Sequence, residues 1–150
     1  MELVLIRHAV AEGNLRQTFL GRTDDPLAAC GVELACRRRQ ELPPVLRVYA
    51  SPKLRARCTA RLVWPNAEIA IVPGLREMDF GIFNGRAHAE LMEDPAYREW
   101  LAQGEWEGYP GGETFAQARA RVEAAFRFLV RDATERDLSR VGSVVHGGTL

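Results

Sequence analysis

The stretch ELVLIRHAVAEGN, residues 2–14, decides the fold class of this chain. Its first residues, 2–6, form a short apolar run of the kind that a buried parallel strand shows, and the run stops at Arg7 and His8. Three further runs of this kind lie at 46–50, 68–72 and 141–145. Helical segments separate the runs, and this alternation predicts an α/β fold with three αβα layers around a mostly parallel central sheet.

Four helices are expected from composition and from start and stop signals. Residues 31–42 are followed by a Pro-Pro pair, and residues 53–63 are followed by Trp64-Pro65. Asp94 before Pro95 is typical of an N-cap with proline at the first helical position, and it opens a short helix through Leu101. The longest helix is expected over about 114–132, with one stripe formed by Phe115, Ala118, Val122, Phe126 and Leu129.

Length and composition restrict the classes of protein. A chain of 150 residues has room for one domain, and 47% hydrophobic and 27% charged residues are ordinary globular values. Twenty basic and twenty acidic residues cancel, which predicts neither a nucleic-acid nor a membrane partner. The start lacks the basic region of a signal peptide, and three cysteines without a C-x-x-C pair indicate neither a disulfide framework nor a zinc ribbon. We therefore expect a cytoplasmic protein.

Polar side chains follow each of the four predicted strands. Ligands of such sheets bind outside the carboxyl ends of the strands, so these residues are expected on one rim. Two histidines, two arginines and a glutamate there predict a phosphate site with a nucleophile and an acid. In chain order, the residues are Arg7, His8 and Asn14; Ser51 and Arg55; Glu77, at the end of the stretch Leu75-Arg76-Glu77; and His146, Gly147 and Gly148.

The segment LIRHAVAEGN, residues 5–14, resembles the Arg-His-Gly signature of the histidine phosphatase superfamily, which includes the cofactor-dependent phosphoglycerate mutases. The resemblance extends over nearly the whole chain and implies a phosphoglycerate mutase-like fold with one histidine phosphatase domain over 1–150. It also implies a metal-independent phosphomonoesterase that acts through a phosphohistidine intermediate. Five further stretches follow in the family's order: GRTDDPLAACG, SPKLRARCTA, LREMDFGIFNG, PGGETF and VVHGG.

The resemblance implies a role for each rim residue. His8 is the nucleophile, and Glu77 protonates the leaving oxygen and then takes a proton from the attacking water. No metal ion or cofactor is required, because arginines and histidines neutralise the charge of the phosphoryl group. The residues implied around that group are Arg7, Asn14, Arg55, His146 and Gly147.

Other assignments stay open at several of these positions. Asp79 lies close enough in sequence to Glu77 to be the acid in its place. Arg57 and Arg61 lie near Arg55 in the sequence and could bind the phosphoryl group in its place, but the spacing of Arg55 to Thr59-Ala60 matches the family and favours Arg55. His88 has no motif support, so a solvated histidine of the cap region is expected there.

Two positions depart from the family pattern: Ala9 replaces the usual glycine, and Ala11 replaces a threonine or serine. Loss of one neutral hydrogen bond costs about 0.5–1.5 kcal/mol, which weakens the site without abolishing its chemistry. An active enzyme is therefore favoured, and a non-catalytic phosphate-binding or regulatory member is the alternative.

The chain stops four residues after His146, whereas family members commonly continue with a helix and at least one more element. Without them, one side of the strand that precedes His146 is expected to lie uncovered and to expose apolar surface. Either the chain is the C-terminally incomplete part of a longer protein, or a homodimer or a rearrangement covers this surface.

Residues of about 80–112 are expected to form a cap over the substrate. Residues 87–112 contain six acidic residues and one basic residue, Arg98. Because a bisphosphate needs additional basic residues around it, this negative net charge disfavours the substrate of a mutase. The aromatic residues there suit a small-molecule monophosphate with a flat group, or they simply pack the cap; they are Tyr97, Trp100, Trp106 and Tyr109. The stretch LREMDFGIFNG is similar to the alpha-ribazole phosphatases of cobalamin biosynthesis, whose motifs broad-specificity sugar and nucleotide phosphatases share.

Overall fold

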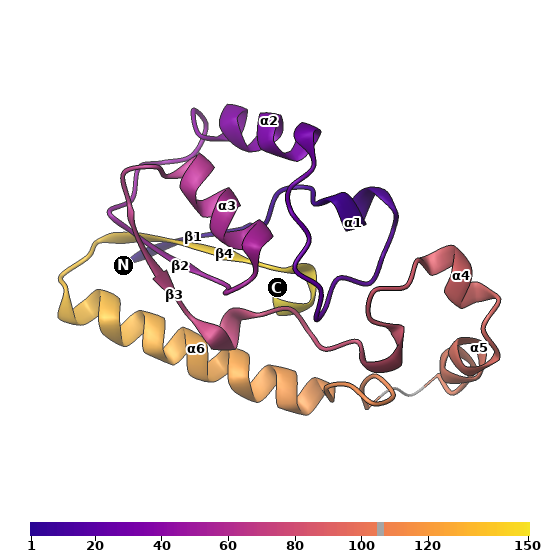
Figure 1. Cartoon of the computed structure of the whole chain (residues 1–150). Coiled ribbons are helices and arrows are strands. Elements are labelled where there is room, and N and C mark those ends of the chain that lie inside the picture. Colours follow the sequence, from indigo (N-terminus) through magenta and orange to yellow (C-terminus); the bar gives the residue numbers. More distant parts are fainter. Residues whose placement is uncertain (105–106) are drawn as a thin grey trace.

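Four strands form one parallel sheet in the computed structural model, which describes residues 1–104 and 107–150 (Figure 1). The spatial order is β1-β4-β2-β3, and each neighbouring pair runs parallel. The four apolar runs of the sequence therefore became strands, and the predicted parallel sheet is confirmed. The strands are β1 (Glu2–Arg7), β2 (Arg47–Ala50), β3 (Glu68–Ile71) and β4 (Arg140–Val145).

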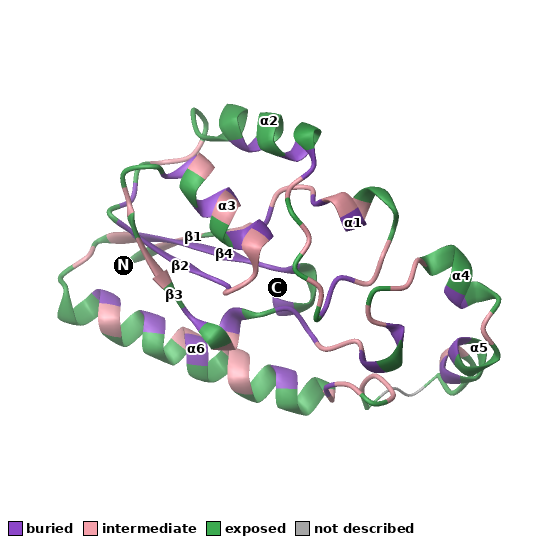
Figure 2. Ribbon diagram, in the orientation of Figure 1, coloured by how far each residue is buried: buried purple, intermediate pink, exposed green. Residues whose placement is uncertain are grey.

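Helices cover both faces of this sheet. Helices α2 (Ala29–Arg38) and α3 (Leu54–Val63) lie on one face, and α6 (Phe115–Glu135) lies on the other. Each face of the sheet has its own hydrophobic core, and alternate residues of β2 contribute to each. Val48 packs in the core beneath α3, whereas Tyr49 packs in the core beneath α6. The buried residues of these elements face the sheet in Figure 2, so the three-layer αβα architecture is confirmed.

The N-cap predicted at Asp94 forms, and Thr114, predicted only as the approximate start of the longest helix, is an N-cap as well. Asp94 Oδ1 accepts a hydrogen bond from the N–H of Ala96 at 2.8 Å at the start of α5 (Pro95–Ala102). Thr114 Oγ1 accepts from the N–H of Gln117 at 3.1 Å at the start of α6. Helices α1 (Glu12–Leu15) and α4 (His88–Met92) were not predicted, because four or five residues are too few to show a helical period. None of the described helices is long and apolar enough to cross a membrane.

The predicted stripe of α6 is only partly its buried face. Ala118 and Leu129 are buried as expected, and Ala125 and Ala133 join them. Phe115, however, is 38% exposed. It occupies the first turn of the helix, where it packs edge-on against Tyr109 instead of against the sheet.

A third apolar cluster lies beyond the end of the sheet. It is built around Phe83, Leu91, Tyr97 and Trp100, and it joins α4 to α5 (Figure 1). Two roles were expected for the aromatic residues of the cap: contact with a flat group of the substrate, or packing of the cap itself. Tyr97 and Trp100 are buried within the cluster, so these two residues pack the cap. Glu105 and Trp106 of the expected cap lie outside the described residues.

The expectation that the strand before His146 has an uncovered side is wrong. Strand β4 is inserted between β1 and β2, and its residues 141–145 are all buried. The edge strands of the sheet are β1, where Leu5 is 39% exposed, and β3, where Ile71 is 45% exposed. The sequence could not show this, because the spatial order of strands differs from their order along the chain.

The core facing α6 gives a first prediction. Leu129 is fully buried and the adjacent Val130 is 49% exposed, so the two residues form a matched pair on one helix. Leu129→Ala should lower the free energy of unfolding by about 2–5 kcal/mol, because it leaves a cavity between α6 and the sheet. Val130→Ala should change it by roughly 0.5 kcal/mol or less. Urea denaturation followed by circular dichroism measures both, and equal losses would contradict this packing.

Candidate active site

The two histidines of the predicted rim are brought together by the pairing of β1 with β4. Arg7 lies opposite Val145 in this register, and the N–H of His8 donates to the Val145 carbonyl at 2.9 Å. The residues after the two strands, His8 and His146, are therefore neighbours. Their ring centroids are 5.1 Å apart, with an angle of 55° between the planes.

The buried imidazole of His8 is oriented by its own backbone neighbour. Nδ1 lies 2.7 Å from the carbonyl oxygen of Ala9, which can only accept, so Nδ1 carries the proton and Nε2 keeps a free lone pair. Burial lowers the pKa of His8 to about 4, and the charges of Arg55 and Arg7 act in the same direction. The hydrogen bond to Ala9 opposes the shift without cancelling it. His8 is therefore a neutral imidazole with a free Nε2 lone pair at ordinary pH.

Arg55 is a fully buried cation beside this imidazole. Its Nη1 and Nη2 donate to the carbonyls of Thr23 at 3.0 Å and Leu20 at 2.5 Å. Its Nε has no hydrogen-bond partner among the described residues. Carbonyl oxygens orient a guanidinium without neutralising its charge, so Arg55 provides a fixed positive charge for an anion.

His146 lies behind His8 and is itself fully buried. Its Nε2 is 2.6 Å from the hydroxyl oxygen of Ser51, at the end of β2, and its Nδ1 has no partner among the described residues. Burial, with the charges of Arg55 and His8, lowers its pKa to about 2. His146 is therefore a neutral ring whose orientation is fixed by Ser51.

Glu77 is a buried carboxyl group facing the same site. The N–H of Met78 donates to Oε1 at 2.9 Å, and the N–H of Gly148 approaches Oε2 at 3.5 Å. Burial raises the pKa of Glu77 in spite of these bonds and of the charge of Arg55. A Cβ at Gly148 would lie 2.5 Å from Glu77 Oε1, so a side chain there would displace the carboxyl group.

One cavity of about 420 Å³ is shared by five of the predicted site residues. Gly147 is not among the described lining residues, but it lies beside one of them: a Cβ there would stand 3.6 Å from the guanidinium carbon of Arg7. Asn14 also makes a local hydrogen bond, in which its Oδ1 accepts the N–H of Ala11 at 2.8 Å. The predicted residues that line the cavity are Arg7, His8, Asn14, Arg55 and Glu77, whereas His146 is covered by them.

The sequence did not identify three aromatic side chains of this cavity. Phe19 and Phe80 line it and meet edge-to-face, with ring centroids 5.2 Å apart. His88 is exposed, as expected, but it also lies on the cavity wall, at the start of α4. None of the three follows a strand, so the argument from strand ends could not find them.

Asp79, the alternative to Glu77, is engaged elsewhere. Its carboxylate lies 2.9 Å from Arg22 Nε and accepts hydrogen bonds from the N–H of Gly81 and the amide of Asn84. These bonds lower its pKa although burial opposes them. Asp79 is absent from the described lining of the 420 Å³ cavity, so the geometry favours Glu77 as the acid.

The two departures from the family pattern have little effect on the cavity. Ala9 packs against the core under α3, and its N–H donates to Thr59 Oγ1 at 2.9 Å. Ala11 is fully buried and its N–H is bound by Asn14. Neither methyl group belongs to the described cavity lining.

This fold and this group of side chains define a phosphate-handling enzyme class. The sequence model of the histidine phosphatase superfamily (branch 1) matches residues 3–150, and the chain belongs to that family. It is 33% identical to the adenosylcobalamin/alpha-ribazole phosphatase of Escherichia coli, over its full length and 75% of that protein.

Solved structures of the same family superpose on the chain. The alpha-ribazole phosphatase from Shigella flexneri matches with a TM-score of 0.83 at 32% identity, covering 99% of this chain and 75% of that one. A phosphoglycerate mutase from Thermus thermophilus matches with a TM-score of 0.72 at 35% identity, covering 99% of this chain and 80% of that one.

The opposite pKa shifts of His8 and Glu77 predict the pH dependence of phosphate-ester hydrolysis. kcat/KM should rise as pH increases through about 4, where His8 loses its proton, and should fall once pH exceeds the raised pKa of Glu77. Glu77→Gln should lower the rate and remove the Glu77 part of the basic limb. Titration of the substrate phosphate is common to both profiles, so identical basic limbs in the two proteins would contradict the assignment.

Proposed function

We propose that this chain hydrolyses a small phosphate monoester through a phosphohistidine at His8. The observation that carries the proposal is the shared cavity lined by a neutral imidazole, the buried Arg55 cation and the Glu77 carboxyl, whose pKa is raised by burial. These are the three components that phosphoryl transfer to nitrogen needs: a nucleophile, charge neutralisation and an acid.

In the first step, His8 Nε2 attacks phosphorus in line and the bond to the ester oxygen breaks. Glu77 gives its proton to the departing oxygen, so the alcohol leaves neutral. His8 keeps its Nδ1 proton, and the positive charge of the phosphorylated ring is stabilised by the Ala9 carbonyl at 2.7 Å. Arg7, Arg55 and Asn14 neutralise or bind the oxygens of the transferring group.

In the second step, water attacks the phosphohistidine from the side that the alcohol has left. The Glu77 carboxylate takes a proton from this water, and the N–P bond breaks to release phosphate and regenerate neutral His8. One carboxyl group therefore serves both steps. Its burial suits the first step, and the nearby Arg55 suits the ionised form that the second step requires.

The substrate that we propose is alpha-ribazole 5′-phosphate, because two of the relatives named above are alpha-ribazole phosphatases. Phe19 and Phe80 offer ring faces and edges to a flat base, and the exposed His88 lies beside them. We assign the segment of about 80–112 as the cap that places these groups, within one histidine phosphatase domain spanning 1–150. Its aromatic contribution comes from Phe80, while Tyr97 and Trp100 support the cap from within.

The cavity supports phosphoglycerate mutase activity less well than hydrolysis. A mutase must bind a bisphosphate, whereas Arg7 and Arg55 are the arginines among the described cavity residues. A non-catalytic phosphate-binding protein would not need a buried carboxyl group with a raised pKa in the cavity that contains His8. Both considerations favour hydrolysis.

Loss of the nucleophile should abolish turnover. With EDTA present near pH 6, His8→Ala should release no phosphate from p-nitrophenyl phosphate, whereas the wild type should turn over. Alkaline quenching of the wild type followed by peptide mass spectrometry should place the phosphoryl group on His8. Activity that survives in a folded His8→Ala protein would overturn the mechanism.

Removal of the buried cation has a matched control on the same helix. Arg55→Met should lower kcat/KM by roughly 10²–10³, the cost of one charge-stabilising donor, while exposed Arg57→Met should change it little. Circular dichroism checks that both variants fold. Equal kinetics in the two variants would remove Arg55 from the site.

The aromatic wall predicts the choice of substrate. Phe80→Leu keeps apolar volume but removes the ring, so kcat/KM for alpha-ribazole 5′-phosphate should fall roughly tenfold to a hundredfold, the range of a lost base stack. kcat/KM for glycerol 3-phosphate, which has no base, should be nearly unchanged. A wild type that prefers 3-phosphoglycerate to alpha-ribazole 5′-phosphate would refute this substrate.

A further inference from the structure

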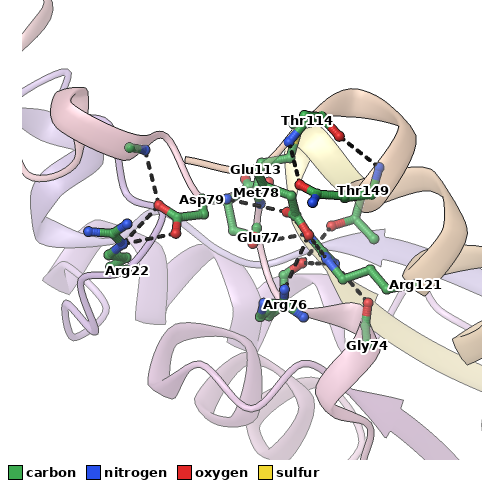
Figure 3. Close-up of polar contacts among 12 residues, drawn as sticks. Arg22, Gly74, Arg76, Glu77, Met78, Asp79, Glu113, Thr114, Arg121 and Thr149 are labelled. Atoms are coloured by element: carbon green, nitrogen blue, oxygen red, sulfur yellow. Dashed lines mark hydrogen bonds and ion pairs between the residues drawn. The ribbon is translucent and has the colours of Figure 1, made fainter. Parts of the chain in front are cut away.

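A buried ion pair lies directly behind the loop that carries Glu77. Arg121, on α6, donates from Nε and Nη2 to the two carboxylate oxygens of Glu113 at 2.6 and 2.7 Å. The side chains of Glu113 and Arg121 are only 7% and 13% exposed. Figure 3 shows this pair against residues 74–79, which we call the acid loop.

The same guanidinium also binds the backbone of the acid loop. Nη1 of Arg121 donates to the carbonyls of Gly74 and Arg76, each at 2.8 Å, and Nη2 reaches the carbonyl of Glu77 at 3.2 Å. Three carbonyls within four residues are therefore held by one side chain. The fork of a guanidinium provides these directions at once, which the single ammonium group of lysine cannot.

Glu113 completes the attachment from the other side. Its Oε1 accepts from Arg76 Nη2 at 3.1 Å, and its Oε2 receives the N–H of Asp79 at 3.4 Å. The acid loop is thus bound by backbone or side chain at Gly74, Arg76, Glu77 and Asp79 (Figure 3).

Neither residue of this pair is part of the described lining of the cavity that contains His8 and Glu77. Their ionised groups also have little to offer stability, because the cost of desolvating a buried pair offsets most of its attraction. What the pair provides is geometry: two of the five hydrogen bonds from the rigid Arg121 guanidinium fix it on Glu113, and the other three hold carbonyls of the acid loop.

We propose that Arg121 and Glu113 are positioning residues that hold the acid loop so that the Glu77 carboxyl stays buried and directed at the leaving oxygen. This inference rests on the proposed role of Glu77 as the acid. Without the pair, the loop moves and water reaches the carboxyl group, which then loses its proton at lower pH. kcat/KM should therefore fall most for substrates whose leaving group must be protonated as it departs.

The test uses two leaving groups and Arg121→Lys, which keeps the charge but not the fork. For an alkyl phosphate such as glycerol 3-phosphate, kcat/KM should fall roughly a hundredfold, toward the lower end of what a general acid contributes. For p-nitrophenyl phosphate, whose leaving group departs without a proton, kcat/KM should fall by less than about threefold. The basic limb of the pH profile should also move to lower pH.

The control is Arg119→Lys, on the exposed side of the same helix, where Arg119 pairs with Glu123 at 2.8 Å. It should leave both substrates unaffected. Glu113→Gln keeps the shape of the pair without its charge and should show the same selectivity between leaving groups, so it decides the outcome if Arg121→Lys does not fold.

Two results would overturn the inference. Equal losses on both substrates would indicate a merely structural role, and no loss on either would show that the acid loop needs no such support. Failure of the wild type to hydrolyse either substrate, by contrast, would overturn the proposed function itself.

Discussion

The parallel pairing of β1 with β4 is the constraint on which the site depends. Because Arg7 lies opposite Val145, the next residue of each strand arrives at the same edge, and His8 stands beside His146. A shift of one residue in this register would send alternate side chains to the other face of the sheet and separate the rings. Arg7 at the end of β1, Asn14 on α1, Arg55 on α3 and Glu77 after β3 line the same cavity as His8.

Burial of the site changes the protonation equilibria of its histidines and of its carboxyl group in opposite directions. Burial disfavours the charged form of every titratable group, so His8 and His146 become neutral while Glu77 becomes harder to ionise. Arg55 remains charged because a guanidinium resists deprotonation, and backbone carbonyls orient it. A neutral imidazole, a carboxyl group with a raised pKa and a fixed cation therefore lie in one cavity. Each would behave differently on the protein surface.

Much of the fold could be predicted because its signals are local. Apolar runs marked the four strands, and Asp94 and Thr114 marked two helix starts. The prediction that one side of β4 is uncovered failed, because burial depends on which strands are neighbours in the sheet. The short α1 and α4 were missed for a different reason, since a single turn has no period to detect.

The sequence by itself determined the order of strands and helices and placed histidine, arginine and glutamate at the strand ends, because these patterns span only a few residues. Only the tertiary structure decided which partners these groups meet. Ser51 contacts His146 from 95 positions away, and Arg121 binds the carbonyl of Glu77 across 44. Phe80 likewise reaches Phe19 to form the cavity wall. Such contacts arise when separate elements pack against one another, and no local pattern along the chain encodes them.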